Sequence, residues 1–275
     1  MQSLISNIWV LGWSLFFTAA IWGGAYSFGF FLPLQDRKPR IGWKETVLAF
    51  ALFLVFQLFF LPFLITGIAL SIGQTTLSLQ TKAWMNLGSI VVLGGLLLAY
   101  TASLKSKVQW FSREEALRNI GLGTICWIIA FPVIVALSQF LTIIFFDWLG
   151  FEMEDQMAVK QIKSVQDYPW LFAVNLIAIA FIVPFIEELL FRGYLQESLL
   201  KKFSAMKSIA LTALLFSLFH FSPSQGINNI LILTSLFLLA CLLGYLKERQ
   251  RSLLPCIALH STFNAISLVQ IFVIQ

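Results

Sequence analysis

The chain has 275 residues, of which 59% are hydrophobic and only 11% are charged, and its formal net charge is +5. Its mean hydropathy of +0.87 lies far outside the soluble range, which excludes a water-soluble globular protein. The basic residues are scattered over short loops without forming a patch, so no nucleic-acid partner is expected.

Apolar runs dominate the chain from end to end. A helix needs about 20 apolar residues to cross a bilayer, and eight runs approach or exceed this length, the sixth being short. They cover residues 4–32, 47–72, 87–103, 120–149, 171–200, 209–221, 227–246 and 253–274. We therefore expect an all-α fold, a polytopic membrane helical bundle with about eight transmembrane helices.

Two features refine this bundle. Pro132 and Pro184 lie inside the fourth and fifth runs and predict kinks there. The first run has neither a basic segment before it nor a cleavage pattern of small residues, so we predict a retained helix and not a signal peptide.

Lysine and arginine alternate between rich and poor loops. The first, third, fifth and seventh loops carry four, four, three and three basic residues, whereas the loops between them carry two at most. The positive-inside rule then places both termini outside and these four loops in the cytoplasm. In the third loop, Ser112 and Glu115 form a capping-box pattern that predicts a short surface helix over residues 113–120.

Ionisable side chains inside three of the apolar runs are the main functional signal. Each costs roughly 2.5–3.5 kcal/mol on insertion scales, and such residues are usually kept for a task. In the fifth run, Glu187, Glu188 and Arg192 form the pattern E-E-x-x-x-R. Glu188 and Arg192 have the i, i+4 spacing of a helical ion pair. Glu187 points about 100° away from Glu188 and can face another helix.

The sixth and eighth runs each carry a histidine. Phe216 and His220 (F-x-x-x-H) share one helix face, and so do His260 and Asn264 (H-x-x-x-N). A single histidine in an apolar helix is often a satisfied core residue. However, at the rise of an α-helix Glu187 and His220 each lie about 20 Å from the basic end of their helix, and His260 and Asn264 about 12 and 18 Å. This similar depth favours one shared site.

These side chains suit the hydrolysis of an amide. Glu187, next to His220, can act as general base on a water molecule and later return the proton to the leaving amine. His260 and Asn264 offer N–H donors for the oxyanion that forms when water attacks a carbonyl. No serine or cysteine has a convincing partner for a nucleophilic role, and the three cysteines lack metal-ligand spacing.

The ordered set of motifs resembles the CPBP family of intramembrane glutamic endopeptidases, which includes the CAAX prenyl endopeptidase and bacterial Abi proteins. The resemblance covers about residues 171–274, whereas the first four helices match only in being hydrophobic. It implies that Glu187 and His220 activate water and that His260 and Asn264 form the oxyanion hole. Glu188, Arg192 and Phe216 would support them.

The resemblance also implies an organisation of the chain and a set of partners. Residues 1–120 would form N-terminal transmembrane helices with the surface helix, and residues 121–275 a catalytic membrane core with its motifs in 187–264. The expected enzyme needs no metal or other cofactor and acts on a peptide or membrane-protein substrate. We expect it in the plasma (inner) membrane, or alternatively in a thylakoid or other organellar membrane, with the active site towards the cytoplasm.

Three other functions remain open at this point. The first is a non-proteolytic membrane regulator or bacteriocin-immunity protein of the Abi type. The second is a transporter with a proton relay, which would predict pseudo-symmetric halves, although the motifs cluster in the C-terminal half. The third is a zinc hydrolase using Glu187, His220 and His260, although no H-E-x-x-H is present.

Overall fold

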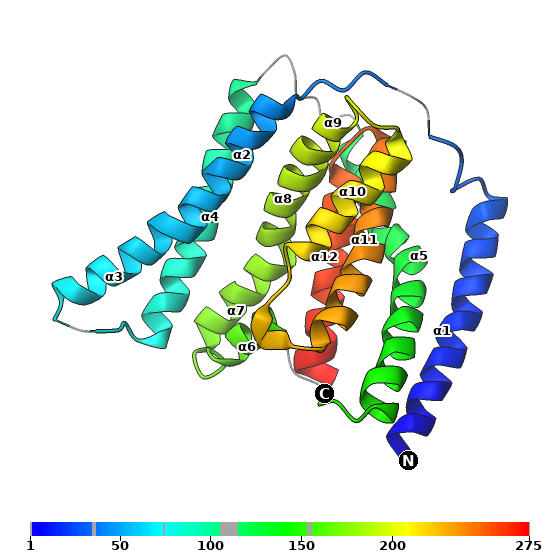
Figure 1. Ribbon diagram of the computed structural model, residues 1–275, viewed down its shortest axis with the longest axis horizontal. Helices are drawn as coiled ribbons and strands as arrows, with labels where there is room; N and C mark the ends of the chain where they lie inside the picture. The colour runs from blue at the N-terminus through cyan, green and yellow to red at the C-terminus, as the bar shows by residue number, and fades with distance from the viewer. Residues whose placement is uncertain (1, 35–36, 74, 105–114, 153–155, 275) are drawn as a thin grey trace. The chain divides into compact units, whose positions relative to one another are not determined.

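The computed structural model describes residues 2–34, 37–73, 75–104, 115–152 and 156–274. These residues form helices and no strand (Figure 1). Seven helical segments are long and apolar enough to cross a membrane: Leu4–Ser27, Trp43–Ser71, Leu79–Ser103, Ala116–Trp148, Pro169–Leu199, Asn228–Gln250 and Leu254–Phe272. The shorter apolar helix Ala205–Leu218 corresponds to the short sixth run. The predicted all-α membrane bundle is therefore confirmed.

Some helices are longer than the apolar runs of the sequence, because polar residues continue the helix beyond the run. The third span begins at Leu79, eight residues before the apolar run, because the Ser78 hydroxyl caps it by accepting the Thr81 N–H at 3.1 Å. The sixth span, Asn228–Gln250, continues beyond its apolar run and ends where Arg251 adopts a left-handed conformation, with φ of 56°. Of the predicted surface helix, residues 113 and 114 lie outside the described residues, and Ala116–Ile120 form the start of a membrane-spanning helix.

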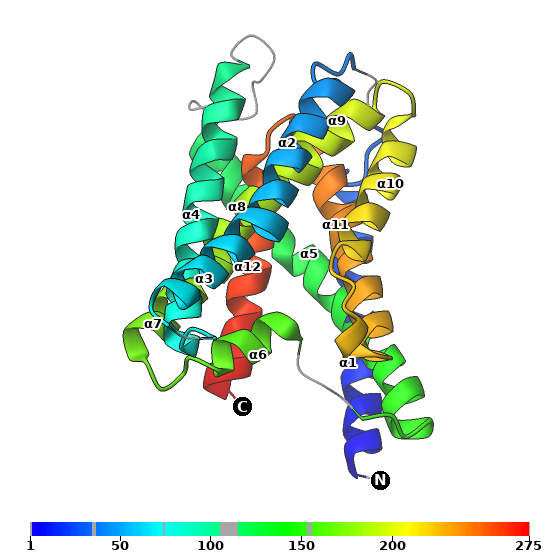
Figure 2. The same cartoon turned by 60° about the vertical axis from the view of Figure 1, so that its left-hand side comes forward.

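The chain divides into two compact units that interleave in sequence. Unit 1 contains Met1–Lys38, Phe111–Gln156 and Lys202–Leu259. It holds α1 (Gln2–Ser27), α5 (Ala116–Thr142) with the π-segment η2 (Ile143–Trp148), α10 (Ala205–Leu218), the 3-10 turn η5 (Pro223–Gln225), α11 (Asn228–Gln250) and the start of α12 (Leu254–Val269). Here α1 packs against α5, and α11 packs against both α5 and α10 (Figure 2).

Polar contacts and one close approach hold unit 1 together. Trp22 Nε1 donates to the Ile129 carbonyl at 3.0 Å, which joins α1 to α5. At Gly123, an added Cβ would lie 2.2 Å from the Pro255 carbonyl oxygen. Only glycine therefore allows the backbones of α5 and α12 to approach this closely at that point.

Unit 2 contains Pro39–Trp110, Met157–Lys201 and His260–Gln275. Its second span joins α2 (Trp43–Val55), the π-segment η1 (Phe56–Phe60) and α3 (Leu61–Ser71), followed by α4 (Leu79–Ser103) and α6 (Met157–Lys163). The fifth span joins α7 (Pro169–Ile177), η3 (Ala178–Ile182), α8 (Val183–Glu188), η4 (Leu189–Leu195) and α9 (Gln196–Leu199). The rest of α12 and η6 (Gln270–Ile274) complete the unit.

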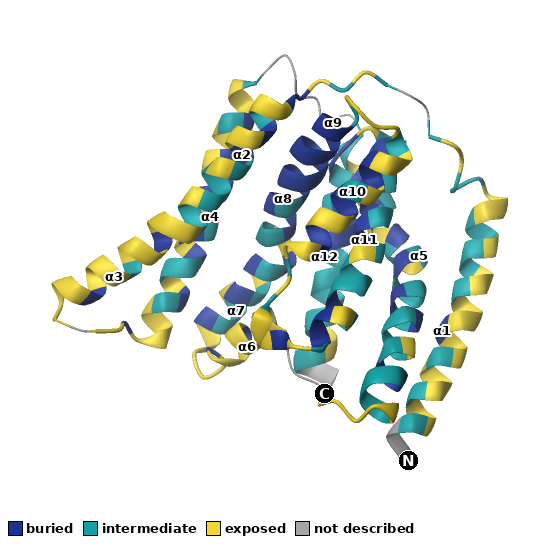
Figure 3. Cartoon of the chain, viewed as in Figure 1, coloured by how far each residue is buried: buried dark blue, intermediate teal, exposed yellow. Residues whose placement is uncertain are grey.

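The fifth span is the most deeply buried part of unit 2. Every residue from 188 to 199 is buried, whereas α3 is mostly exposed, as expected for a lipid-facing surface (Figure 3). The Thr46 hydroxyl donates to the Tyr194 carbonyl at 3.0 Å, and the Tyr194 hydroxyl lies 2.8 Å from that of Thr101. These bonds tie α2 and α4 to η4, so the span that carries the two adjacent glutamates is fixed from two neighbouring helices.

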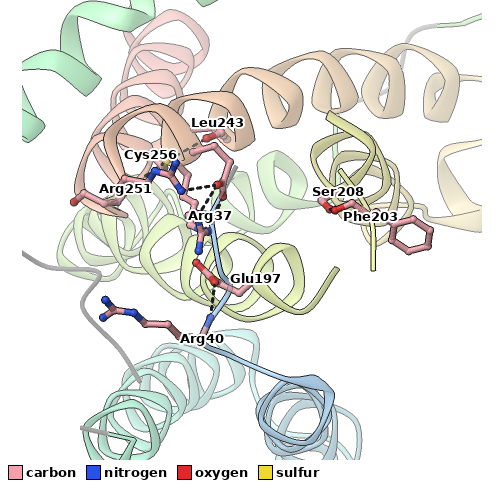
Figure 4. A network of polar contacts seen from close by, with 11 residues as sticks. Arg37, Arg40, Glu197, Phe203, Ser208, Leu243, Arg251 and Cys256 are labelled. Carbon is pink, nitrogen blue, oxygen red and sulfur yellow. Dashed lines mark hydrogen bonds and ion pairs between the residues drawn. The ribbon is translucent and has the colours of Figure 1, made fainter. Parts of the chain in front are cut away.

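A cluster of charges closes the basic end of α11 in unit 1. Glu248 accepts two hydrogen bonds from Arg37, at 2.8 and 2.9 Å, and one from Lys247 at 2.9 Å, and its Oε2 lies 3.8 Å from Arg251 Nη1. Arg37 and Arg251 are labelled in Figure 4. Arg37 follows α1 in unit 1, so this bidentate pair holds Arg37 against the end of α11. In unit 2, the Arg40 backbone N–H donates to Glu197 at 3.4 Å.

Candidate active site

The fifth span departs from regular α-helix on both sides of Glu187 and Glu188. The π-segment η3 precedes α8 and the π-segment η4 follows it. Pro184 near the start of α8 has no N–H to donate to the preceding turn. Segments of π-helix are rare and occur frequently at functional sites. The two glutamates therefore lie at the end of a six-residue α-helical piece between two widened turns.

Glu188 is the centre of a buried hydrogen-bond network. Its side chain and that of Arg192 are both 0% exposed, and Arg192 Nη1 donates to Glu188 Oε1 at 2.8 Å. The helical ion pair predicted from the i, i+4 spacing is present. The same Oε1 lies 2.9 Å from His260 Nδ1. Glu188 thus joins the first motif to the third, a contact between two helices that the spacing within one helix could not indicate.

The contacts of His260 define which of its nitrogens carries hydrogen. A carboxylate only accepts hydrogen bonds, so Nδ1 carries the proton that faces Glu188. The other nitrogen, Nε2, lies 3.7 Å from Glu187 Oε2. Because Nδ1–H is already engaged, His260 can donate through Nε2 only as the imidazolium ion.

Glu187 differs from Glu188 in its exposure. Its side chain is 18% exposed, whereas that of Glu188 is fully buried. The two adjacent carboxylates are therefore separated, as the helical geometry predicted. One is enclosed by Arg192 and His260, and the other reaches accessible space beside the same histidine.

Asn264 lies one turn beyond His260 on α12. Its Nδ2 donates to the Ile179 carbonyl at 3.0 Å, so one of its two N–H groups is used within unit 2. The second N–H remains the group that the predicted oxyanion role would require. That role stays a prediction.

His220 lies in unit 1, in the turn after α10. Its Nδ1 lies 2.9 Å from the Phe216 carbonyl oxygen, and the two rings have centroids 4.9 Å apart. A carbonyl only accepts, so Nδ1 carries hydrogen and Nε2 is the nitrogen that can accept a proton. This bond gives the F-x-x-x-H spacing a physical reason. The expected pairing of His220 with Glu187 stays a prediction.

Asn229 is a residue of unit 1 that the motifs did not indicate. Its Oδ1 accepts the Ser222 N–H at 3.1 Å, and its Nδ2 donates to the carbonyls of Ser222 and Gly226 at 2.7 and 3.0 Å. It therefore fixes the connection that directly follows His220. The only sequence signal for it is an asparagine at the start of an apolar helix after a Gly-containing turn.

No group of three or more His, Cys, Asp or Glu is arranged to hold a metal ion among the residues that the structure describes. Glu188 Oε1 already accepts hydrogen bonds from Arg192 and His260. The zinc hydrolase stays an alternative prediction.

A polytopic helical bundle with buried carboxylate, guanidinium and imidazole groups inside its spans defines an integral, multi-pass membrane protein with an ionisable intramembrane site. Residues 169–266, from α7 to α12, match the family model described as Type II CAAX prenyl endopeptidase Rce1-like. The match covers about a third of the chain and includes all three motifs, and it confirms the resemblance to the CPBP and CAAX protease family. It supports an intramembrane protease of the CAAX type. Neither a curated protein nor a solved structure matches the chain.

Proposed function

We propose that the protein is an intramembrane endopeptidase that hydrolyses a peptide bond with water activated by glutamate and histidine, without a metal ion. The observation that carries this proposal is the network in which Glu188 holds both Arg192 and His260 while Glu187 reaches accessible space beside the same imidazole. Such a separation of two neighbouring carboxylates into a supporting and a reactive group is suited to general base catalysis.

Glu187 is the proposed general base. It would remove a proton from the attacking water and deliver it to the leaving amine, so that no covalent intermediate forms. His220 is its proposed partner on the basis of the motif set and of its own geometry. With Nδ1–H held by the Phe216 carbonyl, its Nε2 is the nitrogen that can accept a hydrogen bond from the water.

His260 and Asn264 are the proposed oxyanion donors. His260 would donate through Nε2 as the imidazolium ion, with Nδ1–H fixed by Glu188. Asn264 would donate the N–H that is not engaged by Ile179. Donors that are oriented before the reaction stabilise developing charge without reorganising. Glu188, Arg192 and Phe216 orient these groups and do not take part in proton transfer.

The proposal extends to the surroundings of the site. The proposed substrate is a peptide or a membrane protein presented within the cytoplasmic half of the plasma membrane. The helical rise places the site residues about 12–20 Å from the ends of their helices that border the basic loops. The positive-inside rule places these loops in the cytoplasm. Residues 121–275 form the proposed catalytic core, and residues 1–120 the proposed N-terminal transmembrane part.

The decisive experiment compares peptide termini in membranes of cells that carry the wild type or Glu187→Ala. New C-termini that depend on Glu187 would identify both the activity and the substrate. Identical termini, together with an unchanged phenotype of the variant, would contradict proteolysis and favour a non-catalytic regulator.

Metal independence gives a separate prediction. Because water activation is assigned to Glu187 and His220, the purified protein should hold no stoichiometric zinc, and chelators should leave turnover at the wild-type level. Elemental analysis before and after chelation measures this. One zinc per chain, lost together with activity and restored with it, would establish Lewis-acid activation of water instead.

A further inference from the structure

The carbonyl of Ile179, in the π-segment before α8, has lost both of its ordinary helical donors. An α-helix would supply the N–H of Val183, but that N–H donates to the Ala178 carbonyl in the wider π pattern. Continuing the π pattern would supply the N–H of residue 184, which is proline and has none. A backbone carbonyl inside a membrane-spanning segment needs another donor, since lipid supplies none.

The donor comes from α12. Asn264 Nδ2 donates to the Ile179 carbonyl at 3.0 Å. One turn earlier on α12, His260 Nδ1 donates to Glu188 Oε1 at 2.9 Å. Two hydrogen bonds therefore connect α12 to the fifth span, one just before α8 and one at its last residue.

We propose that Asn264 is a positioning residue, which takes over the carbonyl released by η3 and Pro184 and so fixes α8 against α12. Loss of this bond lets η3 rearrange into regular α-helix, or lets water reach the Ile179 carbonyl. In either case α8 shifts. The shift changes the bond between Glu188 and His260 at the other end of α8, and moves Glu187 with it. The effect on catalysis rests on the proposed function, whereas the effect on His260 does not.

This task is separate from donation to an oxyanion. The amide of Asn264 has two N–H groups, one held by Ile179 and one left for substrate. A purely oxyanion role predicts that removing the side chain affects turnover only. A positioning role predicts that the hydrogen bond of His260 changes even with no substrate present.

The chain contains only two histidines, so ¹⁵N-histidine NMR reports on this bond directly. Labelled protein in detergent micelles gives signals for His220 and His260, assigned with a His220→Gln variant. In Asn264→Ala we expect the His260 Nδ1–H resonance to shift or broaden beyond detection. Turnover should fall about 10²-fold, the loss expected for a misplacement of about 1 Å. Asn264→Gln, which keeps an amide donor on a longer arm, should restore the His260 signal in part.

Asn175→Ala is the matched control. Asn175 lies in the fifth span, which also carries Ile179. It is buried and donates to a carbonyl, that of Leu171, but within its own helix at 2.8 Å. Its removal should leave the His260 resonance at the wild-type position. A change of similar size in this control would overturn the proposal, because it would reveal a general loosening of the span.

The outcomes separate the two roles of Asn264. A folded Asn264→Ala protein with an unchanged His260 resonance overturns the positioning role, whatever its turnover; Asn264→Leu, which has no side-chain N–H but fills more of the space, gives the same readout if the alanine variant fails to fold. A shifted resonance in a protein whose wild type shows no proteolysis would keep the positioning role and refute the proposed function.

Discussion

Glu187→Gln is expected to abolish peptide hydrolysis while leaving a folded, membrane-inserted protein. Glutamine keeps the size of glutamate and most of its hydrogen bonding but cannot accept the proton of the attacking water. General base catalysis contributes about 10²–10⁴-fold to rate, so turnover should fall by at least that factor. The measurement is cleavage by purified wild-type and variant protein of the substrate found by comparing termini, with thermal unfolding to establish that folding is unchanged.

Glu197→Gln is a matched control for this substitution. Glu197 is another glutamate of the fifth span, but it is buried, accepts the backbone N–H of Arg40 and has no part in the proposed chemistry. Its variant should keep turnover within a few-fold of wild type. Wild-type turnover by Glu187→Gln would remove Glu187 from the mechanism and leave Glu188 or a metal-bound water as the candidates.

The sequence predicted the features of this fold that depend on neighbours in the chain. The ion pair of Glu188 and Arg192 follows from one helical turn, and the spans follow from runs of apolar residues. The start of α4 at Leu79 was missed because its first turns are polar and are held by the Ser78 cap, which contributes no hydropathy. Such helix ends depend on single hydrogen bonds and not on averages.

The contacts between helices could not be predicted in the same way. His260 was expected to serve the oxyanion alone, and its bond to Glu188 depends on how α12 packs against the fifth span. The bond from Asn264 to Ile179 depends in addition on a π-segment, which has no signature in hydropathy or spacing. Pro184 was the one local sign of it, because it predicted an irregularity in this span.

These contacts are the basis for proposing different functions for the two adjacent glutamates. Glu188 is enclosed, shares one oxygen between a guanidinium and an imidazole, and thereby fixes the orientation of His260. Glu187 is turned away by the helix and keeps accessible surface. A general base needs such access to water, whereas a residue that orients a histidine needs burial and a fixed geometry.

Glu188→Ala is expected to destabilise the protein by about 3–5 kcal/mol, the usual cost of removing one partner of a buried ion pair. The Arg192 guanidinium would keep its charge in a site with 0% exposure, and His260 would lose the acceptor of its Nδ1–H. Replacing Arg192 with methionine in the same chain should restore part of the loss, because no buried charge then remains uncompensated. Thermal unfolding of the two single variants and the double variant in one detergent measures this coupling.

The exposed pair of Glu115 and Arg118 is the control for this prediction. It has the same 2.8 Å separation, but its side chains are 44% and 67% exposed. Glu115→Ala should therefore cost only about 0–1 kcal/mol. If Glu188→Ala were equally mild and yet inactive, Glu188 would act on the substrate or the water itself. If the double variant were no more stable than Glu188→Ala, the destabilisation would come from the lost bond to His260 and not from the charge on Arg192.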